Sequence, residues 1–306
     1  MLMTRIDTWL ATRRASGFAL EGYERHLHQF AEFAAARGDD HVRAETAVAW
    51  ALQKATPGQR CRHYQRIVQL AGYLHAEDPR HEIPPNHHFP GKRQRPVPYI
   101  YTPDEARRLV ETAARLGPAG SSRPRTVSTM LALLFATGLR ISEALAVRMA
   151  DVTPDGLVIS NTKFGKTRLV PLHPSAQNGL EQYLHYRRAM VGKDDHVFVS
   201  LKGTRLSYRA FRKAWLAVLT GADLLPRPDG RRPRVHDIRH TFAVRALESA
   251  PDRRDRVAKH MLAVSTYLGH SCVADTYWYF QATPTLMEQS LRHLLASFSH
   301  FFTALS

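Results

Sequence analysis

The stretch VHDIRHTFAVRAL, residues 235–247, places two histidines and an arginine within five residues. Its apolar spacing predicts a helix on which His236 and Arg239 share a face and His240 lies near them. A zinc site needs a third ligand and usually a carboxylate base, and Arg239 would put a fixed positive charge beside the metal. Guanidinium and imidazole N–H groups both donate to phosphoryl oxygens, so the stretch favours a phosphate site.

Three further segments carry residues suited to phosphate chemistry. They are ATGLRISEAL (136–145), TKFGKTRLVPL (162–172) and YLGHSCVADTYWYF (267–280). Arg140 stands where a helix is expected to begin, and the helix dipole makes this an unfavourable place for a cation unless an anion lies nearby. Tyr277 and Tyr279 are two positions apart, so on a helix only one of them can face a cluster of arginines.

Together with HDIRHTFA, these segments resemble the tyrosine recombinase family, which includes the phage integrases and the chromosome-dimer resolving recombinases. All four occur in the family's order and spacing, over most of residues 100–283. The stretch DTYWYFQATPTLM is most similar to recombinases of mobile elements. A histidine that the family often has two residues after the nucleophile is replaced here by Gln281.

The resemblance implies a catalytic set made of Arg140, Lys163, His236, Arg239, His270 and Tyr279. The two arginines would clamp the non-bridging oxygens of a DNA phosphate. Tyr279 would attack the phosphorus and form a 3′-phosphotyrosyl link, with His236 as proton acceptor, while Lys163 would protonate the departing 5′-oxygen and His270 would hydrogen-bond the phosphate. Lys166 is the alternative acid on the same hairpin. This chemistry needs no metal and no other cofactor, and His240 is expected to be a hydrogen-bonded core histidine outside the site.

The composition sets the class of partner. The chain has 306 residues, 44% of them apolar, which predicts a folded protein of two domains. Its net charge is +16 and 35 of its 43 cationic residues are arginines, which favours a nucleic acid, although a GC-rich genome would also raise the arginine content. Cys61 and Cys272 are expected to be reduced thiols. Without an apolar span or a secretion signal, we expect a cytoplasmic, nucleoid-associated protein without membrane contact.

Helical periodicity dominates the N-terminal part. Apolar residues three and four apart predict helices over 4–14, 20–37, 44–53 and 57–75. A proline-rich stretch with a basic KRQR core follows, and we interpret 83–101 as an interdomain linker. The residues expected to touch DNA phosphates are Lys92, Arg93, Arg95, Lys166 and Arg168.

The C-terminal part mixes helices with a hairpin. Thr102 and Glu105 have the spacing of a helix N-terminal capping box, and Gly138 is expected to end an apolar helix. Alternating residues around Phe164–Lys166 predict a β-hairpin, HVFVS (196–200) could add a strand, and helices are expected over 207–219, 236–249 and 252–268.

The predicted fold class is mainly α with a small β-sheet. It comprises a helical bundle of the SAM-like core-binding type at 1–82, the linker at 83–101, an α+β catalytic domain at 102–283 and a C-terminal helix at 284–306. That last helix has a broad apolar stripe, which needs a groove. The resemblance implies that it docks on a neighbouring protomer in a tetramer on double-stranded DNA, with a monomer or weak oligomer when free.

Three other functions compete with a DNA recombinase. A type IB topoisomerase shares the chemistry but relaxes DNA without exchanging strands. A non-catalytic DNA-binding regulator could use the same scaffold. A zinc hydrolase built on His236 and His240 is the third.

Overall fold

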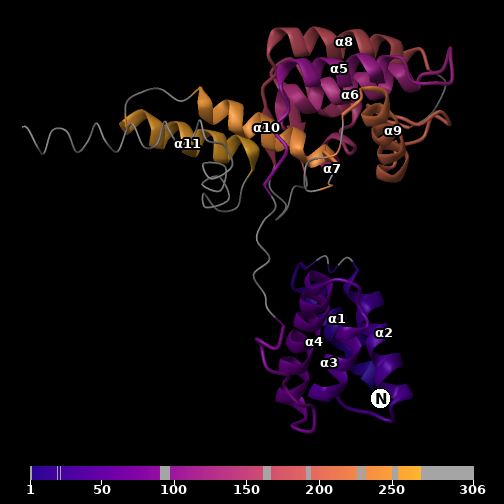
Figure 1. The fold of residues 1–306 in the computed structure, drawn as a ribbon, viewed down its shortest axis with the longest axis vertical. Helices are drawn as coiled ribbons and strands as arrows, with labels where there is room; N and C mark the ends of the chain where they lie inside the picture. The colour runs from indigo at the N-terminus through magenta and orange to yellow at the C-terminus, as the bar shows by residue number, and fades with distance from the viewer. Residues whose placement is uncertain are drawn as a thin grey trace, which may run out of the picture. The chain divides into compact units, whose positions relative to one another are not determined.

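The structure is a computed structural model. It describes residues 2–18, 20, 22–89, 97–160, 167–190, 194–224, 226, 230, 232–249 and 254–269, with backbone alone for 254–258. The chain divides into two compact units, Met1–Pro96 and Val97–Ser306, here called the N-terminal unit and the C-terminal unit (Figure 1). Several predicted positions lie outside the described residues: Lys92, Arg93, Arg95, Lys163, Lys166, His270, Tyr279 and the segment 284–306.

The N-terminal unit is a bundle of four helices. They are α1 (Leu2–Ala15), α2 (Tyr23–Ala36), α3 (Ala44–Leu52) and α4 (Pro57–Glu77), which confirms the four predicted helices. At the start of α4 the Thr56 hydroxyl accepts the Gln59 N–H and the Gln59 side chain accepts the Thr56 N–H, both at 3.3 Å. Phe30, Trp50 and Tyr64 are almost fully buried between the helices and supply much of the apolar area that stabilises the bundle.

Both ends of the predicted linker pack against a unit. The Tyr64 hydroxyl donates to the Pro85 carbonyl at 3.0 Å, and the Phe89 ring lies edge-on to Tyr64 with centroids 5.1 Å apart. In the C-terminal unit Tyr101 is 1% exposed and its hydroxyl donates to the Arg234 carbonyl at 3.0 Å. The aromatic side chains hold both ends because they bury large apolar surfaces. The proline-rich, basic composition of 83–101 did not reveal this packing.

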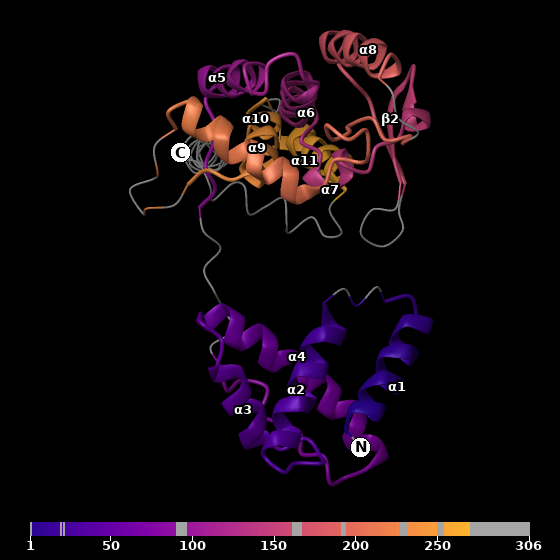
Figure 2. The same cartoon turned by 90° about the vertical axis from the view of Figure 1, so that its right-hand side faces the viewer.

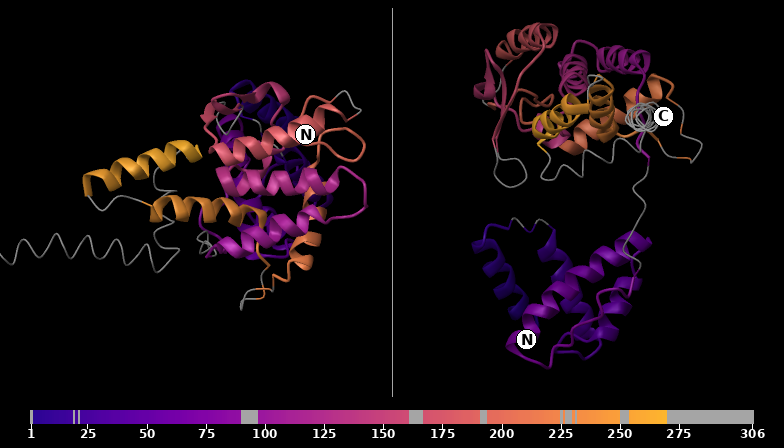
Figure 3. Two further views of the ribbon diagram at one scale, coloured as in Figure 1. Left: turned by 90° about the horizontal axis from the view of Figure 1, so that it is seen from above. Right: turned by 90° about the vertical axis from the view of Figure 1, so that its left-hand side faces the viewer.

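The C-terminal unit contains most of the helices. They are α5 (Pro103–Ala114), α6 (Arg123–Thr137), α7 (Ile141–Ala144), α8 (Pro174–Arg188), α9 (Tyr208–Gly221), α10 (Val235–Glu248) and α11 (Arg254–Leu268). Helices α5, α6 and α8 lie side by side (Figures 1 and 2). Helix α10 packs between α6 and α11, and Figure 3 shows α10 and α11 next to each other in orange and yellow. The sequence patterns predicted all of these except α8, and α7 starts where a helix was expected to begin, at Arg140.

A small antiparallel sheet completes this unit. Its strands are β1 (Val152–Thr153), β2 (Gly156–Ile159) and β3 (Arg168–Val170), in the order β1-β2-β3. In the β2–β3 hairpin Leu157 pairs with Val170 and Ile159 with Arg168. Gly156 follows the turn between β1 and β2. It has φ 129°, and a Cβ there would lie 2.3 Å from the Val170 carbonyl oxygen in β3, so this position requires glycine. The residues 196–200 form only isolated bridges instead of the expected strand.

The mainly α fold with a small β-sheet confirms the predicted fold class. Within the described ranges, no helix combines the length and the apolarity that crossing a bilayer requires.

Candidate active site

The corner between α6 and α7 positions Arg140. Gly138 ends α6 with φ 61°, and a Cβ at this glycine would lie 2.5 Å from the ring of Phe242. The chain therefore turns sharply, and Arg140 becomes the N-cap of α7. The carboxylate of Glu143, one turn later, accepts the Arg140 backbone N–H at 2.9 Å and its Nη1 at 2.8 Å. These bonds fix the direction in which the Arg140 side chain leaves the backbone.

Arg239 reaches the same corner from α10. It is 3% exposed, and its Nη1 donates to the Gly138 carbonyl at 2.9 Å while its Nη2 donates to the Leu268 carbonyl at 2.5 Å. Arg140 donates from Nη2 to the next carbonyl, that of Gly269, at 3.2 Å. The structure thus brings together the two arginines that the sequence predicted to converge.

Arg168 adds a third guanidinium to this group. Its Nη1 and Nη2 donate to the two oxygens of Glu143 at 3.1 and 2.8 Å, and its Nε donates to the Tyr267 carbonyl at 2.9 Å. Its side chain is only 13% exposed. The described contacts of Arg168 are internal, whereas the sequence placed it against DNA phosphates, and that contact stays a prediction. We call Arg140, Glu143, Arg168 and Arg239 the arginine cluster.

The end of α11 is the point on which the arginine cluster converges. The carbonyls of residues 267–269 accept in turn from Arg168, Arg239 and Arg140. The last carbonyls of a helix lack intrahelical donors and form the negative end of its dipole, so three guanidinium groups stabilise this end. The next residue in the chain is His270, the first of the two predicted site residues that follow α11.

Positive side chains outnumber negative ones in the arginine cluster as far as the described residues show. Three guanidinium groups face one carboxylate, that of Glu143, whose side chain is 7% exposed. Burial alone would raise the pKa of Glu143, but the hydrogen bonds from Arg168 and Arg140 outweigh it and lower the pKa to about 2. Glu143 is therefore ionised at neutral pH and pairs with two of the three arginines. Guanidinium N–H donors are suited to bind an oxyanion.

His236 lies in the first turn of α10, beside the arginine cluster. Its residue surface is exposed, yet the protein atoms around the ring desolvate it and the positive charges of Arg239 and Arg234 add to this effect, so the pKa of His236 is lowered. The ring meets that of His240 edge-on with centroids 4.6 Å apart, and His240 is 9% exposed. A neutral imidazole at neutral pH can accept a proton from a nearby hydroxyl.

The sequence reasoning missed the role of Glu143. The residue lies in the segment ATGLRISEAL, three positions after Arg140, and this is the N-cap to N3 spacing of a capping box. That spacing was a usable signal for the bond to the Arg140 backbone. The pairing with Arg168 had no local signal because the two residues are 25 positions apart.

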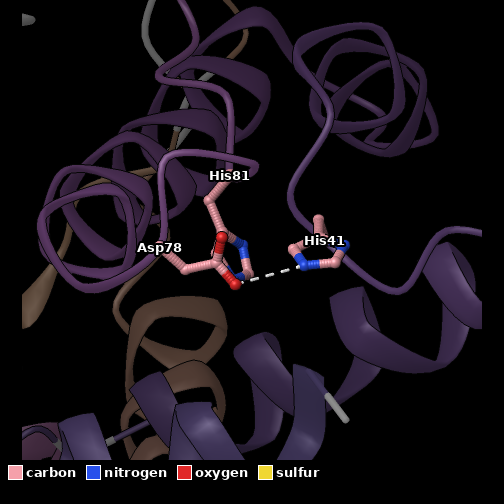
Figure 4. Close-up of side chains that lie close together, drawn as sticks. All are labelled: His41, Asp78 and His81. Atoms are coloured by element: carbon pink, nitrogen blue, oxygen red, sulfur yellow. Dashed lines mark ion pairs between the residues drawn. The ribbon is translucent and has the colours of Figure 1, made fainter.

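A possible metal-ligand group lies in the N-terminal unit. Potential ligand atoms of His41, Asp78 and His81 all lie within 4.8 Å of one another (Figure 4). However, Nδ1 of His81 accepts the Val42 N–H at 3.0 Å, which leaves its Nε2 protonated in the neutral ring. The oxygen Oδ2 of Asp78 also accepts from Arg5, at 3.0 Å. These potential metal ligands are thus already engaged in hydrogen bonds within the protein, and the group is a polar network.

The second such group, Asp194, Asp195 and His196, is engaged in the same way. Asp194 accepts the His196 N–H at 2.9 Å and the Arg205 N–H at 2.7 Å, and Asp195 pairs with Arg148 at 2.9 Å. In the described part of the chain these two groups are the clusters with three potential ligands, and neither includes the histidine pair of the zinc alternative.

Solved structures that share this fold are tyrosine recombinases and integrases. The XerH site-specific recombinase bound to palindromic difH substrate has a TM-score of 0.67 at 19% identity, over 89% of this chain and 78% of that one. The Tn1549 transposon integrase in complex with transposon right end DNA has a TM-score of 0.67 at 15% identity, over 96% of this chain and 100% of that one. At these identities the comparison defines the fold class.

The sequence comparisons define the family. The model of the phage integrase family matches residues 100–285. A putative integrase/recombinase, y4rB, of Sinorhizobium fredii is 35% identical over 300 residues, which cover 94% of this chain and 95% of the relative. Tyrosine recombinase XerD of Brucella abortus is 27% identical over 303 residues, which cover 95% and 94%. The chain belongs to the phage integrase family, and it is a tyrosine recombinase.

The family membership confirms the resemblance found in the sequence. It also confirms the prediction of an enzyme that cuts and rejoins DNA strands, in preference to a topoisomerase or a catalytically idle regulator. The assignment of individual residues to steps of the reaction is the subject of the proposal below.

Proposed function

We propose that this chain is a site-specific DNA recombinase in which Arg140 and Arg239 bind the two non-bridging oxygens of the scissile phosphate. The observation that supports this most is the convergence of both guanidinium groups on adjacent carbonyls, those of Leu268 and Gly269, at the end of α11. A phosphodiester in its transition state carries developing negative charge, and preorganised N–H donors stabilise it. One such donor typically contributes about 3 to 4 kcal/mol.

In the proposed reaction the hydroxyl of Tyr279 attacks the phosphorus and the bond from phosphorus to the 5′-oxygen breaks. The proton of Tyr279 passes to His236, whose lowered pKa keeps it neutral and able to accept. Lys163 gives a proton to the 5′-oxygen, and His270 donates a hydrogen bond to the phosphate. The product is a 3′-phosphotyrosyl ester and a free 5′-hydroxyl.

Rejoining follows from the chemistry of the ester. A phenol has a pKa of about 10, so it leaves readily when a 5′-hydroxyl attacks the phosphotyrosyl link. The ester conserves the energy of the broken bond, and strand joining needs no nucleotide cofactor. The arginines provide the charge stabilisation that a metal ion supplies in many phosphoryl transfer enzymes.

The partner in this proposal is double-stranded DNA, bound by a tetramer in the synapse and by a monomer or weak oligomer outside it. Support comes from the net charge of +16 and from the similarity, at a TM-score of 0.65, to a lambda integrase tetramer bound to a Holliday junction. The segment 284–306 would dock on the neighbouring protomer. The residues proposed to contact the DNA backbone outside the active site are Lys92, Arg93, Arg95 and Lys166. Such an enzyme would act at the nucleoid.

The test is a covalent trapping experiment. A nicked duplex made from the DNA that flanks the gene loses a short fragment after cleavage, which traps the protein on the DNA. We expect the wild-type chain to form an adduct stable in detergent, in the presence of a chelator. Tyr279→Phe removes the nucleophilic oxygen, so its adduct should fall below detection.

Tyr277→Phe is the matched control, because it removes a hydroxyl two positions away and should leave the adduct in place. Loss of the adduct in Tyr277→Phe and its retention in Tyr279→Phe would contradict the assignment. Relaxation of supercoiled plasmid that lacks the flanking DNA would favour a topoisomerase.

A further inference from the structure

We propose that Arg168 is a positioning residue for strand cleavage, which holds Arg140 in place through Glu143 and ties the β2–β3 hairpin to the end of α11. This inference rests on the function proposed for Arg140. It replaces the expected DNA contact of Arg168 with an indirect role, in which the side chain orders other residues and does not touch the phosphate.

The first link is a chain of ion pairs. Arg168 binds both oxygens of Glu143, at 3.1 and 2.8 Å, and the same two oxygens accept Nη1 and the backbone N–H of Arg140 at 2.8 and 2.9 Å. Bidentate pairing between a guanidinium and a carboxylate fixes both angle and distance. The orientation of the Glu143 carboxylate, and with it that of Arg140, therefore depends on Arg168.

The second link is the sharing of one carboxylate between two arginines. Arg168 donates to both oxygens of Glu143. Of the guanidinium nitrogens of Arg140, only Nη1 therefore donates to Glu143, and Nη2 extends to the Gly269 carbonyl at 3.2 Å. Without Arg168, the buried carboxylate would have Arg140 as its remaining ionic partner. Arg140 would then be free to bind both oxygens itself and turn Nη2 away from the position proposed for the phosphate.

The third link joins two segments that carry proposed catalytic residues. Arg168 is the first residue of β3, on the hairpin whose other side leads to Lys163, and its Nε donates to the Tyr267 carbonyl at 2.9 Å. A Cβ at Gly269 would lie 3.0 Å from Arg168 Nη1, so the lack of a side chain at 269 permits this close packing. One side chain thus connects the hairpin, the start of α7 and the last turn of α11.

A direct phosphate contact by Arg168 is the competing role. Both Nη atoms of Arg168 donate to the ionised Glu143 carboxylate, whereas Nη1 and Nη2 of Arg239 donate to the neutral carbonyls of Gly138 and Leu268. A phosphate would have to displace Glu143 or the Tyr267 carbonyl to bind Arg168. These contacts favour the positioning role, and the two roles predict different kinetics.

The experiment measures the single-turnover rate of adduct formation on the nicked duplex at saturating DNA. We expect Arg168→Ala to slow the rate by roughly 10- to 100-fold, because small misplacements of a catalytic group have effects of this size. The affinity for DNA should stay within about twofold of wild type. Arg148→Ala is the matched control, since it removes another arginine of the same unit from an exposed ion pair with Asp195, and its rate should be unchanged.

A substrate with a methylphosphonate at the scissile position separates positioning from general damage. This linkage lacks the negative charge that Arg140 is proposed to neutralise, so a misplaced Arg140 matters less. The loss caused by Arg168→Ala should therefore shrink severalfold on the methylphosphonate. An equal loss on both substrates, or weaker DNA binding with an unchanged rate at saturation, would overturn the positioning role.

Two further variants keep the test valid if Arg168→Ala folds poorly. Arg168→Lys retains the charge but loses the bidentate geometry, so we expect an intermediate rate and the same dependence on substrate charge. In a Glu143→Gln background, substitution of Arg168 should cost less than in the wild type, because the two residues act through one another. Full additivity would count against the proposal. A wild-type chain that forms no adduct would instead defeat the proposed function itself.

Discussion

The two units each contain a polar network, and the two networks differ in composition and in exposure to solvent. In the N-terminal unit Asp78 pairs with Arg5 and Arg80, and Asp40 pairs with His41; the side chains of Arg80 and Asp40 are 69% and 79% exposed, so solvent screens this network. The arginine cluster of the C-terminal unit has three cations and one anion among the described residues. Its side chains are also far more buried, because Arg239 is 3% exposed and the side chains of Arg168 and Glu143 are 13% and 7% exposed.

Removing the charges of the two networks from water also costs different amounts of free energy. Removing a charge from water costs several kcal/mol unless a partner of opposite charge compensates it, and backbone carbonyls compensate a guanidinium only in part. Burying the arginines of the cluster therefore costs more free energy of desolvation, which is expected if they serve the binding and catalysis proposed above. Substitutions in the two networks should thus separate effects on activity from effects on stability.

The largest expected effect is on catalysis, in Arg239→Ala. Loss of one preorganised donor to the phosphate should lower the single-turnover rate of adduct formation by about 10² to 10³-fold. Stability should change much less, because the Gly138 and Leu268 carbonyls lose a donor while the cost of burying a guanidinium group is also removed. Rate measurements at saturating DNA and thermal unfolding would check both parts. A variant with a near wild-type rate would exclude Arg239 from the site.

An intermediate effect, on stability alone, is expected for His81→Leu in the N-terminal unit. His81 is fully buried and its Nδ1 is the acceptor for the Val42 N–H, so the substitution leaves a buried donor without a partner. This should cost about 1 to 3 kcal/mol of unfolding free energy, measured by urea denaturation. The cleavage rate at saturating DNA should be unchanged.

The control for this variant is His28→Leu, because His28 pairs with Asp7 near the surface and should contribute little. If the rate of His81→Leu fell by tenfold while its stability held, the network would have a catalytic role that its contacts do not predict.

The smallest expected effect is the response of the N-terminal unit to mild acid. Burial, the nearby His41 and the guanidinium of Arg5 lower the pKa of His81 from 6.5 to about 4. The unfolded state therefore binds the proton first, and the contribution of His81 to stability is present above pH 6.5 and is lost as the pH falls towards 4. At pH 6 the loss should be at most about 1 kcal/mol.

Hydrogen exchange of amides in α1 to α4, followed by NMR at pH 7.5 and pH 6, would detect this loss after correction for intrinsic rates. His81→Leu should show a smaller change over the same interval. Glu143, with a pKa of about 2, should add no pH dependence until the pH falls below about 4.5. An equal response of wild type and His81→Leu would remove His81 as the cause.

The sequence predicted the parts of the fold that depend on local patterns. The four helices of the bundle follow from apolar spacing, the start of α5 from the Thr102–Glu105 pair, and the end of α6 from Gly138. Helix α8 and strand β1 were missed, the first because it is rich in polar residues and the second because two residues carry no periodic signal. The buried ends of the linker were missed because Phe89 and Tyr101 acquire their burial from distant residues.

The candidate site was predictable in its residue types but less so in its contacts. The convergence of Arg140 and Arg239 followed from the family resemblance, since no local pattern relates residues this far apart. The pairing of Arg168 with Glu143 escaped prediction for the same reason, and a hairpin arginine was assigned to DNA on its charge alone. Ion pairs between distant segments depend on how the helices pack, and sequence periodicity does not report that.

The guanidinium groups of Arg140 and Arg239 are held by backbone carbonyls at the end of α11. The rotational freedom of these two long side chains is therefore lost when the protein folds and not when DNA arrives. In the proposed reaction, capture of a phosphate exchanges neutral acceptors for a charged one, on arginines whose positions the fold has already set.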